Sequence, residues 1–93
     1  EAAAPTGGPL ADFAADRFAG VAPLTVQFAD LSAGDATAWS WDFGDGATST
    51  LQNPSHIFQN SGSFTVTLTT GNSGGQSTRT KTGYIAVKGT IGK

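Results

Sequence analysis

Eight residues from Trp39 to Gly46, Trp-Ser-Trp-Asp-Phe-Gly-Asp-Gly, constrain the fold of this chain more than any other stretch. Successive side chains of an extended strand point to opposite faces, so Trp39, Trp41 and Phe43 share one face. Each large ring removes roughly 150–250 Å² from water when it is buried. The row ends at Asp45-Gly46, a pair typical of a tight chain reversal. We therefore predict a core-facing strand that leads directly into a sharp turn.

The rest of the chain favours short strands over helices. It has 93 residues with 13 glycines and four prolines, and threonine is abundant. Two further segments, Leu24–Asp30 and Ser63–Thr70, alternate apolar and polar residues as half-buried strands do. We predict one all-β domain, an immunoglobulin-like antiparallel sandwich of two sheets with about seven strands. One sheet is expected to hold the strands near Leu10, Val26 and Ile57, and the other those near Trp41, Val66 and Val87.

The expected domain runs from residue 10 to 88, between a linker at 1–9 and a tail at 89–93, because both ends are short and rich in Gly, Pro or Thr. Within it we expect a first strand at Leu10–Ala14, a corner at Asp16–Pro23 and a last strand at Gln76–Val87. Residues Gly71–Gly75 are expected to form an open hairpin. The chain starts with glutamate, which we interpret as a sign that it is one piece of a longer protein.

Three strings of the sequence resemble the signature of PKD domains, the immunoglobulin-like repeats named after polycystin. The string WDFGDG at 41–46 resembles the first, and Asn53-Pro54-Ser55-His56-Ile57-Phe58 resembles the Pro-x-His-x-aromatic motif. Gly62–Leu68 resembles the Gly-x-aromatic-x-Val-x-Leu motif, so the resemblance covers roughly Leu10 to Val87. It implies that the motif residues are structural: Trp41, Asp42, Phe43, Gly44, Asp45, Gly46, His56, Phe58 and Gly62.

The resemblance also implies a function. PKD domains are typically extracellular or cell-surface modules of multidomain proteins, which hold other domains apart and contact proteins or carbohydrates. We therefore expect a non-enzymatic interaction and spacer module whose partners are other protein domains or surface glycans and polysaccharides. The alternative is an accessory substrate-binding domain of a secreted hydrolase, such as a protease, a chitinase or another polysaccharidase. An independent enzyme is a third class, which would need a titrating group in a pocket.

Charge and composition exclude several other classes of protein. The net charge is −2 with only five Lys and Arg residues, which disfavours a nucleic-acid partner. No apolar run approaches the roughly 18 residues of a membrane span. Cysteine is absent, so there are neither disulfides nor thiolate metal sites. We expect no cofactor, and a monomer in isolation.

Several residues have a chemical interpretation beside the structural one. His56 is the only histidine and has no Ser or Cys partner in a recognisable motif, so we interpret it as a half-buried ring that hydrogen-bonds across its strand pair. Asp30, Asp35, Asp42 and Asp45 leave open a calcium site or a pair of catalytic carboxylates. The favoured interpretation is that Asp42 and Asp45 accept hydrogen bonds from the turn backbone, so no catalytic, cofactor or metal residue is predicted.

Two groups of side chains are candidates for ligand contact. Trp39 lies one pleat nearer the end of the sheet than Trp41, where it either caps the core or serves as a stacking platform for a sugar or peptide. Thr65, Thr67 and Thr69 line the solvent side of their strand, and Thr78, Thr80 and Thr82 continue this face on the last strand. Threonine has high strand propensity, which explains this row without a ligand, and the alternative is a hydrogen-bonding surface for a partner or glycan.

Overall fold

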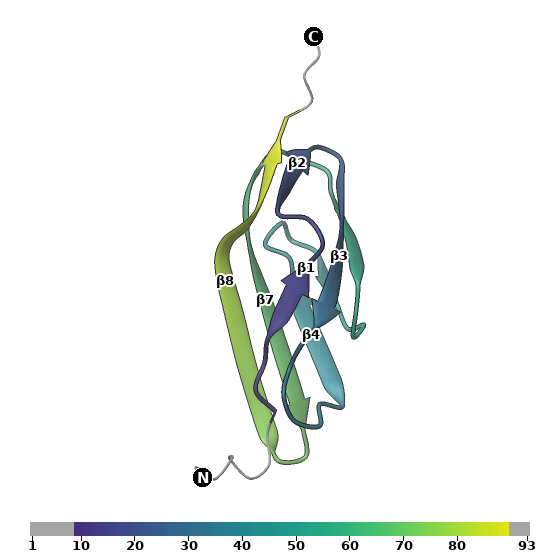
Figure 1. Ribbon diagram of the computed structural model, residues 1–93, viewed down its shortest axis with the longest axis vertical. Helices are drawn as coiled ribbons and strands as arrows, with labels where there is room; N and C mark the ends of the chain where they lie inside the picture. The colour runs from purple at the N-terminus through teal and green to yellow at the C-terminus, as the bar shows by residue number, and fades with distance from the viewer. Residues whose placement is uncertain (1–8, 90–93) are drawn as a thin grey trace.

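Eight β-strands and no helix make up residues 9–89, the part of the chain that the computed structural model describes (Figure 1). The strands are, in chain order, β1 (Phe13–Ala15), β2 (Ala19–Val21), β3 (Leu24–Asp30), β4 (Ala38–Asp42), β5 (Thr48–Ser49), β6 (Ser55–Phe58), β7 (Gly62–Asn72) and β8 (Gly75–Lys88). Accordingly, these residues contain no helix long and apolar enough to cross a membrane.

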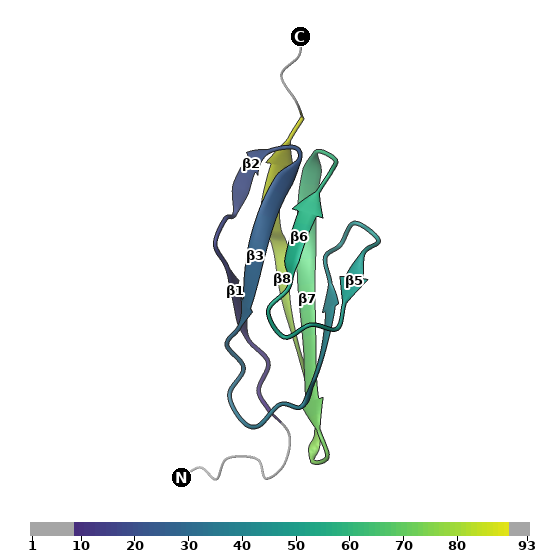
Figure 2. The ribbon, with the colours of Figure 1, turned by 90° about the vertical axis from the view of Figure 1, so that its right-hand side faces the viewer.

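The strands form two sheets, with the orders β1-β3-β6 and β2-β8-β7-β4-β5. Figure 2 shows both sheets face-on, with the sheet of β1, β3 and β6 in front of the sheet that contains β7 and β8. The predicted two-sheet, immunoglobulin-like sandwich is confirmed, with eight strands instead of about seven. Of the predicted linkers, 1–8 and 90–93 lie outside the described residues.

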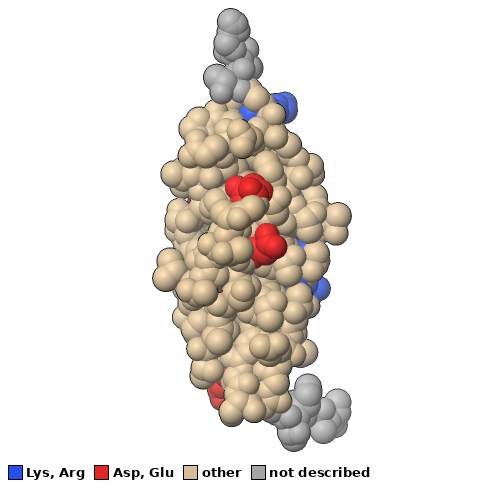
Figure 3. Space-filling model, turned by 180° about the vertical axis from the view of Figure 1, so that it is seen from behind, with Lys and Arg blue, Asp and Glu red and all other residues tan. Residues whose placement is uncertain are grey.

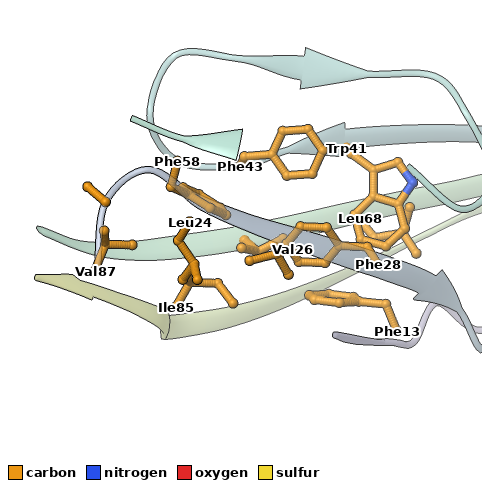
Figure 4. Close-up of a cluster of buried hydrophobic side chains, with 12 residues drawn as sticks. Phe13, Leu24, Val26, Phe28, Trp41, Phe43, Phe58, Leu68, Ile85 and Val87 are labelled. Atoms are coloured by element: carbon orange, nitrogen blue, oxygen red, sulfur yellow. The ribbon is translucent and has the colours of Figure 1, made fainter. Parts of the chain in front are cut away.

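The period-two alternation of β3, β4 and β7 builds the core between the sheets (Figure 4). Trp41 is fully buried at its centre, with the rings of Phe13 and Phe28 at centroid distances of 5.1 and 5.4 Å. Such ring pairs add about 0.5–1.5 kcal/mol each beyond the burial of apolar area. The large apolar side chains that are fully buried come from both sheets and from the turn after β4: Phe13, Val26, Phe28, Trp41, Phe43, Phe58, Val66, Leu68 and Ile85.

The first strand starts later than predicted. It is Phe13–Ala15 instead of Leu10–Ala14, and Leu10 makes only one isolated bridge, to Ala33. Phe13 is fully buried, and alternation then places Ala11 inward and leaves Leu10 57% exposed. Phe13, which has the larger side chain, therefore decides which side of this segment faces the core.

The predicted corner at Asp16–Pro23 contains the short strand β2. Its residues Ala19–Val21 pair in parallel with Ala86–Lys88 of β8, so the sandwich is not wholly antiparallel. The chain thus leaves the first sheet after β1 and joins the edge of the second (Figure 1). The sequence Ala-Gly-Val has no alternation of polarity, which is why this strand was not predicted.

The β7–β8 hairpin is tighter and longer than predicted. Asn72 pairs with Gly75 across a two-residue turn, so the expected open hairpin at Gly71–Gly75 is wrong. Further along, the register advances from Val66–Lys81 to Phe64–Ile85, so β8 takes four residues where β7 takes two. Lys81 and Ile85 stay on the same inner face across this bulge, because the step of four residues from Lys81 to Ile85 on β8 and the step of two from Phe64 to Val66 on β7 are both even intervals. The inner side of β8 is therefore polar before the bulge and apolar after it.

Candidate interaction surface

Trp39 is held at the end of the core by a hydrogen-bonded carboxylate. Its ring is half-buried and packs against the core, and its Nε1–H donates to Asp30 Oδ2 at 2.8 Å. Gln52 donates to the same oxygen at 3.2 Å, and the Ser32 N–H donates to Asp30 Oδ1 at 2.9 Å. Burial alone would raise the pKa of Asp30, but the hydrogen bonds from Ser32, Trp39 and Gln52 outweigh it and lower the pKa below its usual value. The indole is thus oriented from within the protein and exposes only part of its surface.

The turn after β4 is stabilised by its two carboxylates. Asp42 Oδ1 accepts from the Gly44 N–H at 2.9 Å, and Asp45 Oδ1 accepts from the Ala47 N–H at 3.1 Å. Both bonds join residue i to the N–H of residue i+2, the pattern of an Asx-turn. Asp42 and Asp45 therefore serve the backbone of the turn.

His56 ties this turn to the other sheet. Its Nε2 lies 2.7 Å from Asp45 Oδ2, and its ring stacks on Phe43 with centroids 4.2 Å apart and planes at 6°. The expected hydrogen bond across the β3–β6 strand pair is therefore replaced by one to a turn of the opposite sheet. Histidine is suited to this position because a flat ring covers Phe43 while a ring nitrogen reaches the carboxylate.

The remaining motif residues serve the core and the turn. Trp41 Nε1–H donates to the Leu51 carbonyl at 2.9 Å, which satisfies the one polar atom of a fully buried indole. Phe58 is fully buried. Gly44, Gly46 and Gly62 all have positive φ, at 82°, 95° and 149°. These are conformations that favour glycine.

The structure does not gather the acidic residues that left a calcium or catalytic site open. Asp30 lies in the Trp39 corner, whereas Asp42 and Asp45 lie in the turn after β4. Within residues 9–89, no three side chains of His, Asp, Glu or Cys come together in a way that could hold a metal ion. The structure therefore provides no donor set on which to base a metal or a paired-carboxylate mechanism.

The outer face of the five-stranded sheet carries rows of hydroxyl groups. Thr67 lies opposite Thr80, and Thr69 opposite Thr78, with Oγ1–Oγ1 distances of 3.3 and 3.1 Å. Figure 3 shows the molecule from behind, with the outer face of this sheet seen from the side; the surface in view is mostly uncharged, with a few acidic patches and basic atoms near one edge. Hydroxyl groups both donate and accept, so the face suits an uncharged partner with hydrogen-bonding groups of its own.

The two strands of the predicted threonine face differ in exposure. Thr65, Thr67 and Thr69 on β7 are half-buried, and Thr65 Oγ1 accepts from the Gly83 N–H at 3.1 Å. The exposed threonines, Thr78, Thr80 and Thr82, belong to β8, which is nearer the edge of the sheet. Alternation indicates which residues face outward, but it does not indicate which strand is central.

The comparisons with known proteins agree with this geometry. The family model described as "PKD domain" matches residues 7–87. Among solved structures, the PKD1 domain of the Vibrio cholerae metalloprotease PrtV is similar, with a TM-score of 0.71 and 33% identity over 86% of this chain and 96% of that one. The PKD1 domain of Vibrio anguillarum Epp has a TM-score of 0.68 and 30% identity, over 86% of this chain and 95% of that one.

Two curated relatives are far longer than this chain. Collagenase ColA of Bacillus cereus is 41% identical over 49 residues, which are 53% of this chain and 5% of the collagenase. Collagenase ColQ1 of Bacillus cereus strain Q1 is 34% identical over 58 residues, or 62% of this chain and 6% of the collagenase. The match to the family model covers most of the chain, and the three sequence motifs lie in the turn and core of a two-sheet sandwich. The chain therefore belongs to the PKD domain family.

Proposed function

We propose that this chain is a non-catalytic accessory module of a larger extracellular protein, placed beside a hydrolase domain that it spaces and helps to hold on its substrate. One observation supports this most directly: the chain covers 96% of a PKD domain from a metalloprotease but only 5–6% of two collagenases. In those enzymes the matching region is thus a small part beside much other sequence. These relatives are named as collagenases and a metalloprotease, and an extracellular setting fits enzymes of those names.

The arrangement of the strands suits a spacer. The described chain starts at one end of the long axis and finishes at the other, and the molecule measures 56 × 23 × 18 Å (Figure 1). β2, near the start, pairs in parallel with the end of β8. A pull between the two ends therefore loads these hydrogen bonds in shear, so that they must break together instead of one at a time. Such a module would keep its neighbours apart under load.

The neutral hydroxyl rows of the outer face suit contact with a substrate polymer. A test is retention of the purified chain on insoluble collagen, chitin and cellulose. Trp39→Ala alone is a poor probe, because it also removes the hydrogen bond to Asp30. A better pair is Thr78→Lys on the outer face and Ser55→Lys on the exposed side of β6, which put the same charge on opposite sheets.

We expect retention on collagen, weakened by Thr78→Lys and unchanged by Ser55→Lys. Retention on chitin or cellulose with the same pattern would indicate a polysaccharidase as the neighbouring enzyme. Equal retention of both variants would show that the outer face is not the contact surface. No retention on any polymer would refute substrate holding and leave the spacer function alone.

A further inference from the structure

One long edge of the second sheet is open. β7 borders β8 on one side, but on the other side β2 covers only Ala86–Lys88 (Figure 1). β8 begins at Gly75, so the part of the strand before the bulge has no neighbour of its own sheet on this side among residues 9–89. A strand edge of this kind presents a row of unpaired N–H and C=O groups.

The register identifies the groups that point outward. The Gly71 carbonyl accepts from the Thr37 N–H at 2.8 Å, so the backbone of Gly71 faces β4 and not β8. Its partner Gln76 must then direct its own N–H and C=O away from β7, and so must Thr78 and Thr80 at intervals of two. Within the described chain these six groups have no hydrogen-bond partner. Donors and acceptors in this alternating spacing match another extended backbone.

The side chains beside this edge disfavour a second copy of the chain. Arg79 and Lys81 point to the inner side of β8, with Asp12 3.6 Å from both. Antiparallel pairing of two β8 edges would bring arginine and lysine side chains against their own copies, and like charges in such positions are destabilising. Inward-pointing charges are one way in which sheet edges avoid pairing with themselves. The Arg79 side chain is 51% exposed, so it is accessible to an acidic group on a different strand.

An apolar contact lies at the end of the open edge nearest β2. Phe18 is 54% exposed and packs edge-on against Tyr84 at a centroid distance of 5.1 Å. Its carbonyl accepts from the Ala86 N–H at 2.8 Å, so Phe18 lies where β2 begins to cover β8. A strand that paired with the part of β8 not covered by β2 would end beside the Phe18 ring.

We propose that the open edge of β8 from Gln76 to Thr80 binds an extended polypeptide segment as an added strand, with an acidic side chain beside Arg79 and an apolar one against Phe18. This inference rests on the proposed function and goes beyond it, because it adds a second contact site, the open edge, and assigns a polypeptide as the substrate class for that site. The backbone hydrogen bonds provide affinity without regard to sequence, while the two side-chain contacts set a preference.

The test uses the ¹⁵N-labelled chain and an acetylated, amidated octapeptide, Phe-Thr-Val-Thr-Glu-Thr-Val-Thr, designed to run antiparallel to β8. The amides of Thr78 and Thr80 should exchange rapidly in the free protein and about tenfold or more slowly with peptide. Ser77 and Arg79 are internal controls, since their N–H groups face β7. The same peptide N-methylated at its second, third and fourth threonines has no donors for the edge from Gln76 to Thr80 and should give no protection.

Two substitutions at one position separate the contribution of the backbone N–H to binding from that of the side chain. Thr80→Pro removes an N–H that points away from β7, a change that sheet edges tolerate, and should abolish binding. Thr80→Val keeps the N–H and should bind as the natural chain does. Arg79→Glu should weaken binding of this peptide and strengthen binding of the analogue with Lys in place of Glu.

Binding by a folded Thr80→Pro variant, or by the N-methylated peptide, would overturn the proposal. So would a concentration-dependent dimer in sedimentation without peptide, since a second copy would then occupy the edge. These outcomes are distinct from failure of the proposed function. Retention on collagen with no protection at Thr78 and Thr80 would keep the accessory function and refute this site.

Discussion

Gly44 and Gly46 lie two residues apart in one turn but differ in what an added methyl group would meet. Their φ angles are +82° and +95°, so alanine at either position adopts a strained backbone conformation. A Cβ at Gly44 would also collide with the backbone carbonyl of Thr65, whereas nothing lies within 4 Å of a Cβ at Gly46. The colliding atom is a main-chain oxygen of Thr65, at the bulge of β7, so the collision can be relieved only by a shift of the strand backbone.

The expected loss of stability follows from the strained backbone conformation and from the collision with the Thr65 carbonyl. The left-handed backbone costs a non-glycine residue about 1–2 kcal/mol. Overpacking against rigid atoms adds about 1–3 kcal/mol. Gly46→Ala should therefore lower the free energy of unfolding by about 1–2 kcal/mol from the first term alone, and Gly44→Ala by about 2–5 kcal/mol from both. For a domain of this size the difference corresponds to roughly 5–20 °C in Tm.

Urea unfolding followed by tryptophan fluorescence measures this difference, because Trp41 is fully buried and becomes exposed on unfolding. Gly46→Ala is the matched control, since it shares the backbone cost and lacks the collision. Equal destabilisation of the two variants would refute the collision with Thr65. Gly46→Val should lose only the backbone cost and a β-branched increment, because its side chain has open space.

Three further substitutions test other parts of the molecule. The pKa of Asp30 is lowered on folding, so its contribution to stability is present above about pH 5 and is lost as the pH falls below about 4. Trp39→Phe should therefore lower the free energy of unfolding, measured in urea, by about 1 kcal/mol at pH 7 and by less at pH 3, and an equal loss at both would exclude the carboxylate as the cause. Thr70 Oγ1 is buried without a hydrogen-bond partner among the described residues, so Thr70→Val should stabilise by about 1 kcal/mol, and a lower midpoint would contradict this. Thr67→Ser should change stability by less than about 0.5 kcal/mol, and a larger loss would show that the outer face is covered.

Alternation of polarity predicted the parts of the fold in which one face of a strand is apolar. In Leu24–Asp30, the residues Leu24, Val26 and Phe28 are buried and the strand has the predicted bounds. Here sequence and structure agree because burial of large side chains dominates the energy of the strand. The same reasoning located the aromatic row and the turn after it.

Strands that are fixed by partners instead of by burial were not predictable in this way. The three residues of β2 are held by backbone bonds to β8, which depend on no side-chain pattern. The last strand was predicted at Gln76–Val87 and runs over Gly75–Lys88, but its inner side before the bulge carries Ser77, Arg79 and Lys81, so the pattern of apolar residues did not show which face of this part points inward. The partner of Trp39 was also missed, because Asp30 reaches it only after the chain has turned between β3 and β4.

The polar inner side of β8 explains how the sandwich closes at this edge. Lys81 Nζ donates to the Phe13 carbonyl at 2.6 Å, Ser77 Oγ accepts from the Ala11 N–H at 2.9 Å, and Arg79 Nε donates to the Ala11 carbonyl at 3.4 Å. Side chains of β8 thus hold the start of the chain, in place of a backbone ladder.

A ladder here would have moved this segment into the second sheet, as happens at β2. Phe13 would then leave its place between the sheets, where its ring packs against Trp41 and Phe28. Burial of a phenylalanine ring is worth about 1.5–3 kcal/mol, more than a typical net backbone hydrogen bond of about 0.5–1.5 kcal/mol. The core thus keeps Phe13 in the first sheet and the two residues before it on the same side, and the open edge of β8 is the structural consequence of that packing.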